Sequence, residues 1–168
     1  MDKEAVRLRR ATIYDYDFCK ILWDNVDYEI LYGNNKAFGI PEVKNDSTEV
    51  IEFDDLELTK EWFEKCLTVW RHKIYIIEFK FGNIVIPIGY FDLAKTGKGE
   101  PNRLRSWSML PSFFDRKEEA LRLLLNQKQL ANKKITVNIL KSDCEFNWLV
   151  EKFGFREDDT VLSTLSLN

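Results

Sequence analysis

The sequence predicts an α+β domain, and three observations support that fold class. Two β-rich runs, 73–81 and 84–93, are separated by Gly82-Asn83, a pair suited to a tight hairpin turn. Apolar residues recur at helical spacing in four other stretches, several of which begin at a capping residue. The last third of the chain alternates strand, helix and strand, with Gly154 at the position of a helix C′ glycine.

The first half of the chain is expected to hold one strand and two helices before the hairpin. Residues 5–10 alternate apolar and charged side chains, as a half-buried strand does. Thr12 and Asp15 have the T-x-x-D spacing of a helix start, and Thr59 is the expected N-cap of the second helix. In the hairpin that follows, Pro87 indicates a bulge, a strand edge or a break.

The second half adds strands and helices in alternation. Residues 103–110 are predicted to form a fourth strand, and Asp115 begins a third helix. A strand at 135–140 leads to a capping box, S-x-x-E, at Ser142 for the last helix, and a strand at 160–167 ends the chain. Because no internal repeat, low-complexity tract or linker interrupts this order, residues 1–168 are interpreted as one domain.

Composition excludes several classes of protein. The 168 residues are 45% hydrophobic and 14% aromatic, which fits a packed globule rather than a disordered chain. The net charge is -3 without a basic stripe, so we expect no nucleic-acid partner. One histidine and three scattered cysteines, with no C-x-x-C pair, predict no metal site. A charged N-terminus and the lack of a long apolar run predict a soluble, reduced, cytoplasmic protein without a membrane partner.

The order β-α-α-β-β-β-α-β-α-β resembles that of the GCN5-related N-acetyltransferases (GNAT), and three local motifs accompany it. They are Leu8-Arg9-Arg10-Ala11-Thr12 followed by Asp15, Ile86-Pro87-Ile88-Gly89-Tyr90, and Lys152-Phe153-Gly154-Phe155. In the family these correspond to the first strand and turn, the third strand and the end of the last helix. The resemblance covers nearly the whole chain, and it implies a GNAT-like mixed, largely antiparallel central sheet of about seven strands flanked by about four helices.

The same resemblance implies acetyl-CoA as the acyl donor, with its diphosphate on backbone N–H groups at the start of the third helix. The matching stretch, 111–120, lacks the glycines of the family's loop, and it offers Asp115, Arg116 and Lys117 as cofactor-binding residues. Carboxylates such as Asp115 and Glu118 stabilise a helix start by themselves and repel a diphosphate. An altered CoA site and an ordinary, well-capped helix are therefore both open. Backbone N–H groups of the fourth strand would stabilise the reaction's oxyanion, and they are expected at Trp107, Met109 and Leu110.

The family's catalytic side chains are mostly replaced. Val150 stands where many members carry a tyrosine acid, and valine cannot donate a proton. Cys144, near the start of the same helix, is the alternative acid, although free cysteines usually serve as small packing residues. Glu52 and Glu78 are the candidate general bases, Glu78 because it falls among apolar strand residues.

An amine acceptor is suggested by a run of carboxylates before the second helix, although such a run is usually a solvated face. The run consists of Glu42, Asp46, Glu49, Glu52, Asp54, Asp55 and Glu57. Aromatic residues such as Trp23 and Trp62 could line an acceptor pocket or pack in the core. His72 is expected at the surface without a role.

Two functions are thus predicted. The first is an acetyl-CoA-dependent N-acetyltransferase acting on the amine of a small molecule or a protein N-terminus. The second is a catalytically inactive GNAT-fold binding module that has lost CoA binding. A homodimer through the apolar final strand is a further possibility, and packing within one chain explains its leucines as well.

Overall fold

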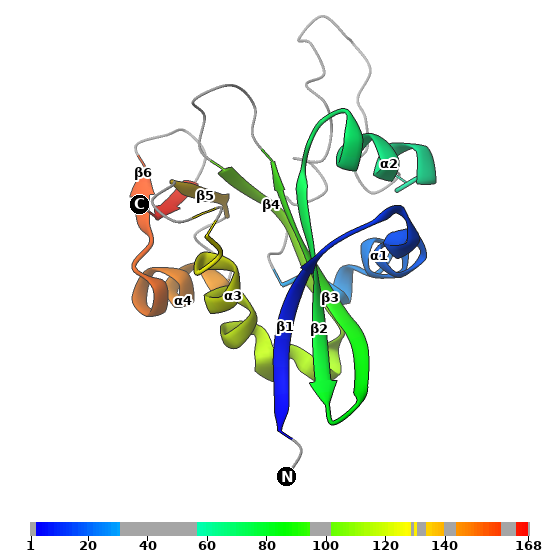
Figure 1. Ribbon diagram of the computed structural model, residues 1–168. Helices are drawn as coiled ribbons and strands as arrows, with labels where there is room; N and C mark the ends of the chain where they lie inside the picture. The colour runs from blue at the N-terminus through cyan, green and yellow to red at the C-terminus, as the bar shows by residue number, and fades with distance from the viewer. Residues whose placement is uncertain are drawn as a thin grey trace, which may run out of the picture.

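A computed structural model describes residues 3–30, 57–94, 102–128, 130, 134–139, 144–158 and 164–167. One seven-stranded sheet runs through the chain in the order β1-β2-β3-β4-β5-β7-β6 (Figure 1). All neighbouring strands are antiparallel except β4 and β5, which are parallel. The predicted α+β class and the mixed, largely antiparallel sheet are therefore confirmed.

The strands have the following bounds: β1 Glu4–Arg10, β2 Lys73–Phe81, β3 Ile84–Ala94, β4 Asn102–Met109, β5 Ile135–Asn138, β6 Arg156–Asp158 and β7 Thr164–Leu167. The β2–β3 hairpin turns at Gly82, whose φ of 61° only glycine adopts at low cost, as the Gly82-Asn83 pair predicts. The register shifts between Ile77 and Glu78 opposite Pro87, so the predicted irregularity is a β-bulge. The short strand β6 was not predicted.

The helices are α1 Tyr16–Trp23, α2 Lys60–Thr68, α3 Lys117–Leu125 and α4 Cys144–Phe153. Asp15 accepts a hydrogen bond from the Thr12 N–H at 2.8 Å, and the Thr59 hydroxyl accepts one from the Trp62 N–H at 3.1 Å, so both predicted helix starts are confirmed. Gly154 ends α4 with a φ of +77°, as predicted. The Ser142 capping box lies outside the described residues.

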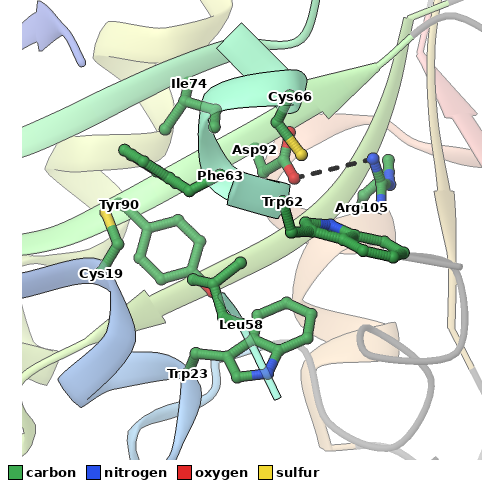
Figure 2. Close-up of a pocket in the computed structure, with 10 residues that line it drawn as sticks. All are labelled: Cys19, Trp23, Leu58, Trp62, Phe63, Cys66, Ile74, Tyr90, Asp92 and Arg105. Atoms are coloured by element: carbon green, nitrogen blue, oxygen red, sulfur yellow. Dashed lines mark ion pairs between the residues drawn. The ribbon is translucent and has the colours of Figure 1, made fainter. Parts of the chain in front are cut away.

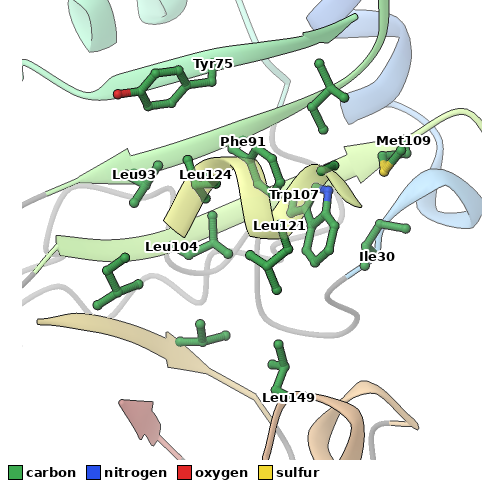
Figure 3. Packing of buried hydrophobic residues seen from close by; sticks show 14 of the residues in the cluster. Ile30, Tyr75, Phe91, Leu93, Leu104, Trp107, Met109, Leu121, Leu124 and Leu149 are labelled. Carbon is green, nitrogen blue, oxygen red and sulfur yellow. The ribbon is translucent and has the colours of Figure 1, made fainter. Parts of the chain in front are cut away.

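Each face of the sheet carries its own hydrophobic core, because alternate residues of a strand point to opposite faces. On one face Tyr75 and Ile77 pack with residues of α3 and α4. Figure 3 shows Leu121 and Leu124 of α3 lying over the sheet beside Trp107 and Phe91, which are all fully buried or nearly so. On the opposite face Ile74 and Ile76 pack with residues of α1 and α2. The candidate site lies on this second face.

The final strand lies inside the sheet. β7 pairs with β5 on one side and with β6 on the other, and Leu165 is completely buried. Its backbone therefore has no free edge for a second copy of the chain, and packing within one chain accounts for Leu165 and Leu167. Among the described residues, no helix is long and apolar enough to cross a membrane.

Candidate functional site

A β-bulge in β4 shapes the centre of the sheet. Asp92 pairs with Ser106 and Leu93 pairs with Leu104, so Arg105 is an extra residue without a partner on β3. A bulge re-aims side chains and bends its strand. Here it directs Arg105 toward the face covered by α1 and α2, where the guanidinium lies beside Asp92 of β3.

Beyond the bulge, β4 has no partner in β5. The two strands pair only at residues 102–104 of β4, whereas β4 continues to Met109. The Leu110 N–H donates to the Ile88 carbonyl at 2.8 Å, on the β3 side. Because backbone groups alternate along an antiparallel ladder, those of Trp107 and Met109 point to the opposite edge. Of the three predicted backbone donors, the Leu110 N–H is thus already hydrogen-bonded to β3. Trp107 and Met109 face the opposite edge of β4, where β5 no longer pairs with it.

A segment of the same chain lies along that edge. The Ile30 N–H donates to the Trp107 carbonyl at 2.9 Å, and Glu29 forms an antiparallel bridge with Ser108. Ile30 itself is buried against the α3–α4 core, near Trp107 and Met109 in Figure 3. The part of β4 on which the resemblance would place a thioester is therefore partly covered by residues 29–30.

A pocket with an empty volume of about 360 Å³ opens on the α1–α2 face of the sheet (Figure 2). Its walls come from α1 and α2, and its floor comes from β2, β3 and β4. The lining residues are Cys19, Trp23, Leu58, Trp62, Phe63, Cys66, Ile74, Tyr90, Asp92 and Arg105. Trp23 and Trp62, suggested by the sequence as acceptor-pocket residues, thus lie together. This volume includes space that is open to solvent.

One end of the pocket carries a buried charged group, formed by Asp92 and Arg105 with His72 behind them. Arg105 lies 3.8 Å from Asp92 Oδ2, and His72 Nδ1 lies 3.1 Å from Oδ1. Burial alone raises the pKa of the Asp92 carboxyl, but Arg105 and His72 outweigh it and hold that pKa below its ordinary value. Asp92 is therefore ionised at neutral pH.

One Asp92 oxygen is not satisfied by this arrangement. Oδ1 is fully buried and has no hydrogen bond among the described residues, although His72 Nδ1 lies 3.1 Å from it. Arg105 Nη1 lies 2.9 Å from Nδ1 and 2.7 Å from Nε2 of His72. A buried ionised oxygen without a donor is costly. The pocket therefore presents an acceptor that a ligand could satisfy.

The predicted surface position of His72 is wrong, since the residue is only 6% exposed. Arg71 has a φ of 52°, a left-handed conformation that reverses the chain after α2, and the His72 N–H bonds the Cys66 carbonyl at 2.8 Å. This turn points His72 inward although charged residues flank it. The sequence did contain one signal for the group, because Asp92 is a lone charge in the apolar run Ile88–Ala94.

Other polar groups near the pocket are neutral. Burial raises the pKa of the Cys66 thiol to about 12 and also raises the pKa of Cys19. Tyr90 shares a hydrogen bond of 2.7 Å with Ser106, and burial raises the pKa of its phenol. None of these three groups is poised to act as a nucleophile or a base at neutral pH.

Glu78, a predicted base, is buried on the same face of the sheet but outside the pocket. Its two oxygens accept hydrogen bonds from Arg7 at 2.9 Å and Arg9 at 3.0 Å. Arg9 also pairs with Asp15 at 2.7 Å, so β1, β2 and the turn before α1 are joined. These bonds favour a structural role, and the catalytic role of Glu78 stays a prediction.

Glu52, the other predicted base, lies outside the described residues, as do Glu42, Asp46, Glu49, Asp54 and Asp55 of the acidic run. Glu57 is described and pairs with Lys20 at 3.1 Å. Cys144 is the first residue of α4, and its side chain is not described. Within the described part of the chain, no group of three histidine, cysteine, aspartate or glutamate residues could hold a metal ion.

The start of α3 differs from a phosphate cradle. The third helix begins at Lys117 rather than at Asp115, because Pro111–Arg116 form a 3₁₀ helix that leads directly into it. The Lys117 N–H donates to the Phe114 carbonyl, and the Phe113 N–H donates to the Leu110 carbonyl. Carbonyls of the preceding turn thus take N–H groups that a free helix start would offer to an anion.

The two cations predicted to bind the diphosphate are held in ion pairs. Lys117 bonds both oxygens of Glu145 at 2.8 and 3.0 Å and lies 4.8 Å from the ring centre of Trp148. Arg116 pairs with Glu4 and Glu119 and stacks over Phe79. Asp115 is exposed. With Glu118 and Glu119 in the first turn of α3 as well, these residues do not fit the diphosphate of acetyl-CoA.

Comparisons with known proteins rest on structure alone. No protein-family model and no curated protein sequence matches the chain. Among solved structures, FdhC, a nucleotide-linked sugar GNAT, is 15% identical, and the match covers 96% of this chain and 85% of that chain with a TM-score of 0.62. SpeG, a spermidine N-acetyltransferase from Vibrio cholerae, is 16% identical over 96% and 92% of the two chains, with a TM-score of 0.61.

An N-acetyltransferase from Staphylococcus aureus is 15% identical over 98% of both chains, with a TM-score of 0.56. Identities this low establish a common fold and leave activity open. The order of the elements and the mixed, largely antiparallel sheet agree with that result. The chain therefore has the fold of the GCN5-related N-acetyltransferases.

Proposed function

We propose that this chain is a ligand-binding module built on the GNAT fold, and that it does not use acetyl-CoA. The observation that carries the proposal is the start of α3. There a 3₁₀ helix takes N–H groups of the helix start, and Arg116 and Lys117 are neutralised by carboxylates from β1, α3 and α4. A diphosphate brought to this place would have to break those ion pairs and approach Glu118 and Glu119.

The pocket on the opposite face supports the binding role. It combines aromatic walls with one buried, ionised acceptor, which is the usual composition of a small-molecule site. The charged group at its end costs stability in an otherwise apolar core, and a binding function accounts for that cost.

A second candidate is an N-acetyltransferase that moves an acetyl group from acetyl-CoA to the amine of a small molecule or a protein N-terminus. The fold shared with FdhC and SpeG and the position of the pocket beside β4 favour it. Glu78, Glu52 and Cys144 stay its predicted catalytic residues. The occupied edge of β4 and the ion pairs at α3 count against it.

Calorimetric titration with acetyl-CoA and with free CoA at modest salt separates the two candidates. We expect no heat of binding up to millimolar concentration. Micromolar binding that weakens in Arg116→Ala and Lys117→Ala would contradict the proposal and restore the acetyltransferase. Arg122→Ala is the matched control, because this cation lies on the same helix but pairs with Glu118 on the exposed surface.

A further inference from the structure

The segment Glu29–Ile30 lies on the edge of β4 in the way that an added strand would. Glu29 forms an antiparallel bridge with Ser108, and the Ile30 N–H donates to the Trp107 carbonyl at 2.9 Å. Among the described residues, β5 pairs with β4 only at residues 102–104, so its ladder ends before this point. A segment far away in the sequence thus supplies a backbone partner to this part of β4.

The Ile30 side chain anchors the segment. The residue is 6% exposed and belongs to the core cluster that also holds Trp107 and Met109, and Figure 3 shows it near both. Because a single bridge contributes few backbone hydrogen bonds, burial of this aliphatic side chain is the larger part of what holds the segment in place. The edge of β4 therefore has a place for one aliphatic side chain next to its backbone groups.

The hold of the segment on β4 is limited. The chain just before it, Val26–Tyr28, forms a 3₁₀ helix rather than an extended strand, so the pairing does not continue in that direction. The Trp107 Nε1 atom is fully buried and has no hydrogen-bond partner among the described residues, so the segment leaves a donor beside it unsatisfied. A chain that stays extended where the 3₁₀ helix turns away would pair with more of β4 than this segment does.

We propose that this edge of β4 is a strand-addition site for an extended peptide that carries an aliphatic side chain, and that Glu29–Ile30 occupies it as an internal competitor. In the bound state a peptide N–H donates to the Trp107 carbonyl, and the aliphatic side chain takes the place of Ile30. In this mode of recognition main-chain hydrogen bonds supply affinity, and the pocket for a side chain supplies specificity. The inference does not involve the pocket beside Asp92, and it rests on the proposed function only in leaving β4 free of acetyl-CoA.

The probe is a synthetic peptide with the sequence of residues 25–30, blocked at both ends and titrated into the full chain. In backbone amide NMR the signals of Ile30 and Ser108 should shift together and saturably, because the displaced segment loses its bond to Trp107 as the peptide replaces it. A matched peptide with the change Ile30→Asp should bind at least about tenfold more weakly, because the side-chain site is apolar. Equal binding of the two peptides, or saturable shifts confined to residues away from β4, would overturn the proposal.

A weaker internal competitor should strengthen peptide binding. In the full chain, Ile30→Ser removes the anchoring side chain and keeps the backbone, so the Kd of the unmodified peptide should fall at least about tenfold. Ile21→Ser makes the same change on α1, where Ile21 is 54% exposed, and should leave the Kd unchanged. No gain in affinity in a folded Ile30→Ser chain, or an equal gain in Ile21→Ser, would overturn the proposal.

If Ile30→Ser does not fold, the titration of the unmodified chain decides. An internal segment competes at an effective concentration in the millimolar range, so the absence of any Ser108 shift up to about 10 mM peptide would then overturn the proposal. The outcome also stands apart from that of the proposed function. Heat from acetyl-CoA in the calorimetric titration would reject the loss of the cofactor, whether or not the peptide binds. Failure of the peptide together with no heat from CoA would reject only the peptide site.

Discussion

The ion pair between Asp92 and Arg105 gives a stability prediction that follows directly from geometry. Their side chains are 11% and 9% exposed, and the closest charged atoms are 3.8 Å apart. At that distance, an effective dielectric constant of about 20 gives an attraction of about 4 kcal/mol. Asp92→Asn also removes a countercharge of the buried Arg105. We therefore expect Asp92→Asn to lower the free energy of unfolding by about 3 kcal/mol.

A double-mutant cycle isolates the interaction, with unfolding followed in urea by tryptophan fluorescence. Once Arg105→Met has removed the cation, Asp92→Asn should cost only about 1 kcal/mol, which makes the coupling energy about 2 kcal/mol. Glu61→Gln breaks a closer pair, 3.2 Å to Lys65, but an exposed one, and should cost a few tenths of a kcal/mol at most. Additive effects of the two pocket substitutions, or a cost of Asp92→Asn no larger than that of Glu61→Gln, would refute the reasoning.

Three further predictions concern packing, thiol chemistry and pH. Gly89→Ala would place a Cβ atom 2.5 Å from the Ser108 carbonyl oxygen, so it should lower the free energy of unfolding by at least about 2 kcal/mol in the same urea titration. Because burial raises the pKa of Cys66 to about 12, iodoacetamide at pH 8 should label this thiol on the order of 10³ times more slowly than a free cysteine. Mass spectrometry of quenched samples measures the labelling rate, and a faster rate would contradict the burial of Cys66. Arg105 and His72 hold the pKa of Asp92 below its ordinary value, so its stabilising contribution is complete above the unfolded value of about 3.9 and is lost as pH falls through the folded value. Stability curves should therefore fall more steeply below about pH 4 for the unmodified chain than for Asp92→Asn, and parallel curves would count against an ionised Asp92.

Local signals in the sequence predicted most of the fold. The caps at Thr12 and Thr59, the turn at Gly82 and the helix end at Gly154 each depend on residues that are neighbours in the chain. The backbone conformations that these residues favour are the same in many proteins. The strand β6 was missed because three residues, Arg156–Asp158, carry too little pattern to identify a strand.

The candidate site was harder to predict, because its groups come from separate elements. His72 precedes β2, Asp92 lies in β3 and Arg105 is the bulged residue of β4, so only the folded sheet brings them together. A bulge position is invisible in the sequence, and so is the left-handed turn at Arg71. Lys117 and Arg116 pair with carboxylates of α4 and β1, which are far from them in the sequence. The sequence does not reveal these ion pairs, so both cations were predicted to bind the cofactor.

Backbone amide NMR with added acetyl-CoA tests the central claim most directly. We predict that at millimolar acetyl-CoA the amide signals of Lys117 and Met109 keep their positions, because the Lys117 N–H already bonds the Phe114 carbonyl and residues 29–30 lie along β4 beside Met109. Saturable shifts of those same signals, with release of the Lys117–Glu145 ion pair, would show that the cofactor binds there. The chain would then be an acetyltransferase rather than a binding module.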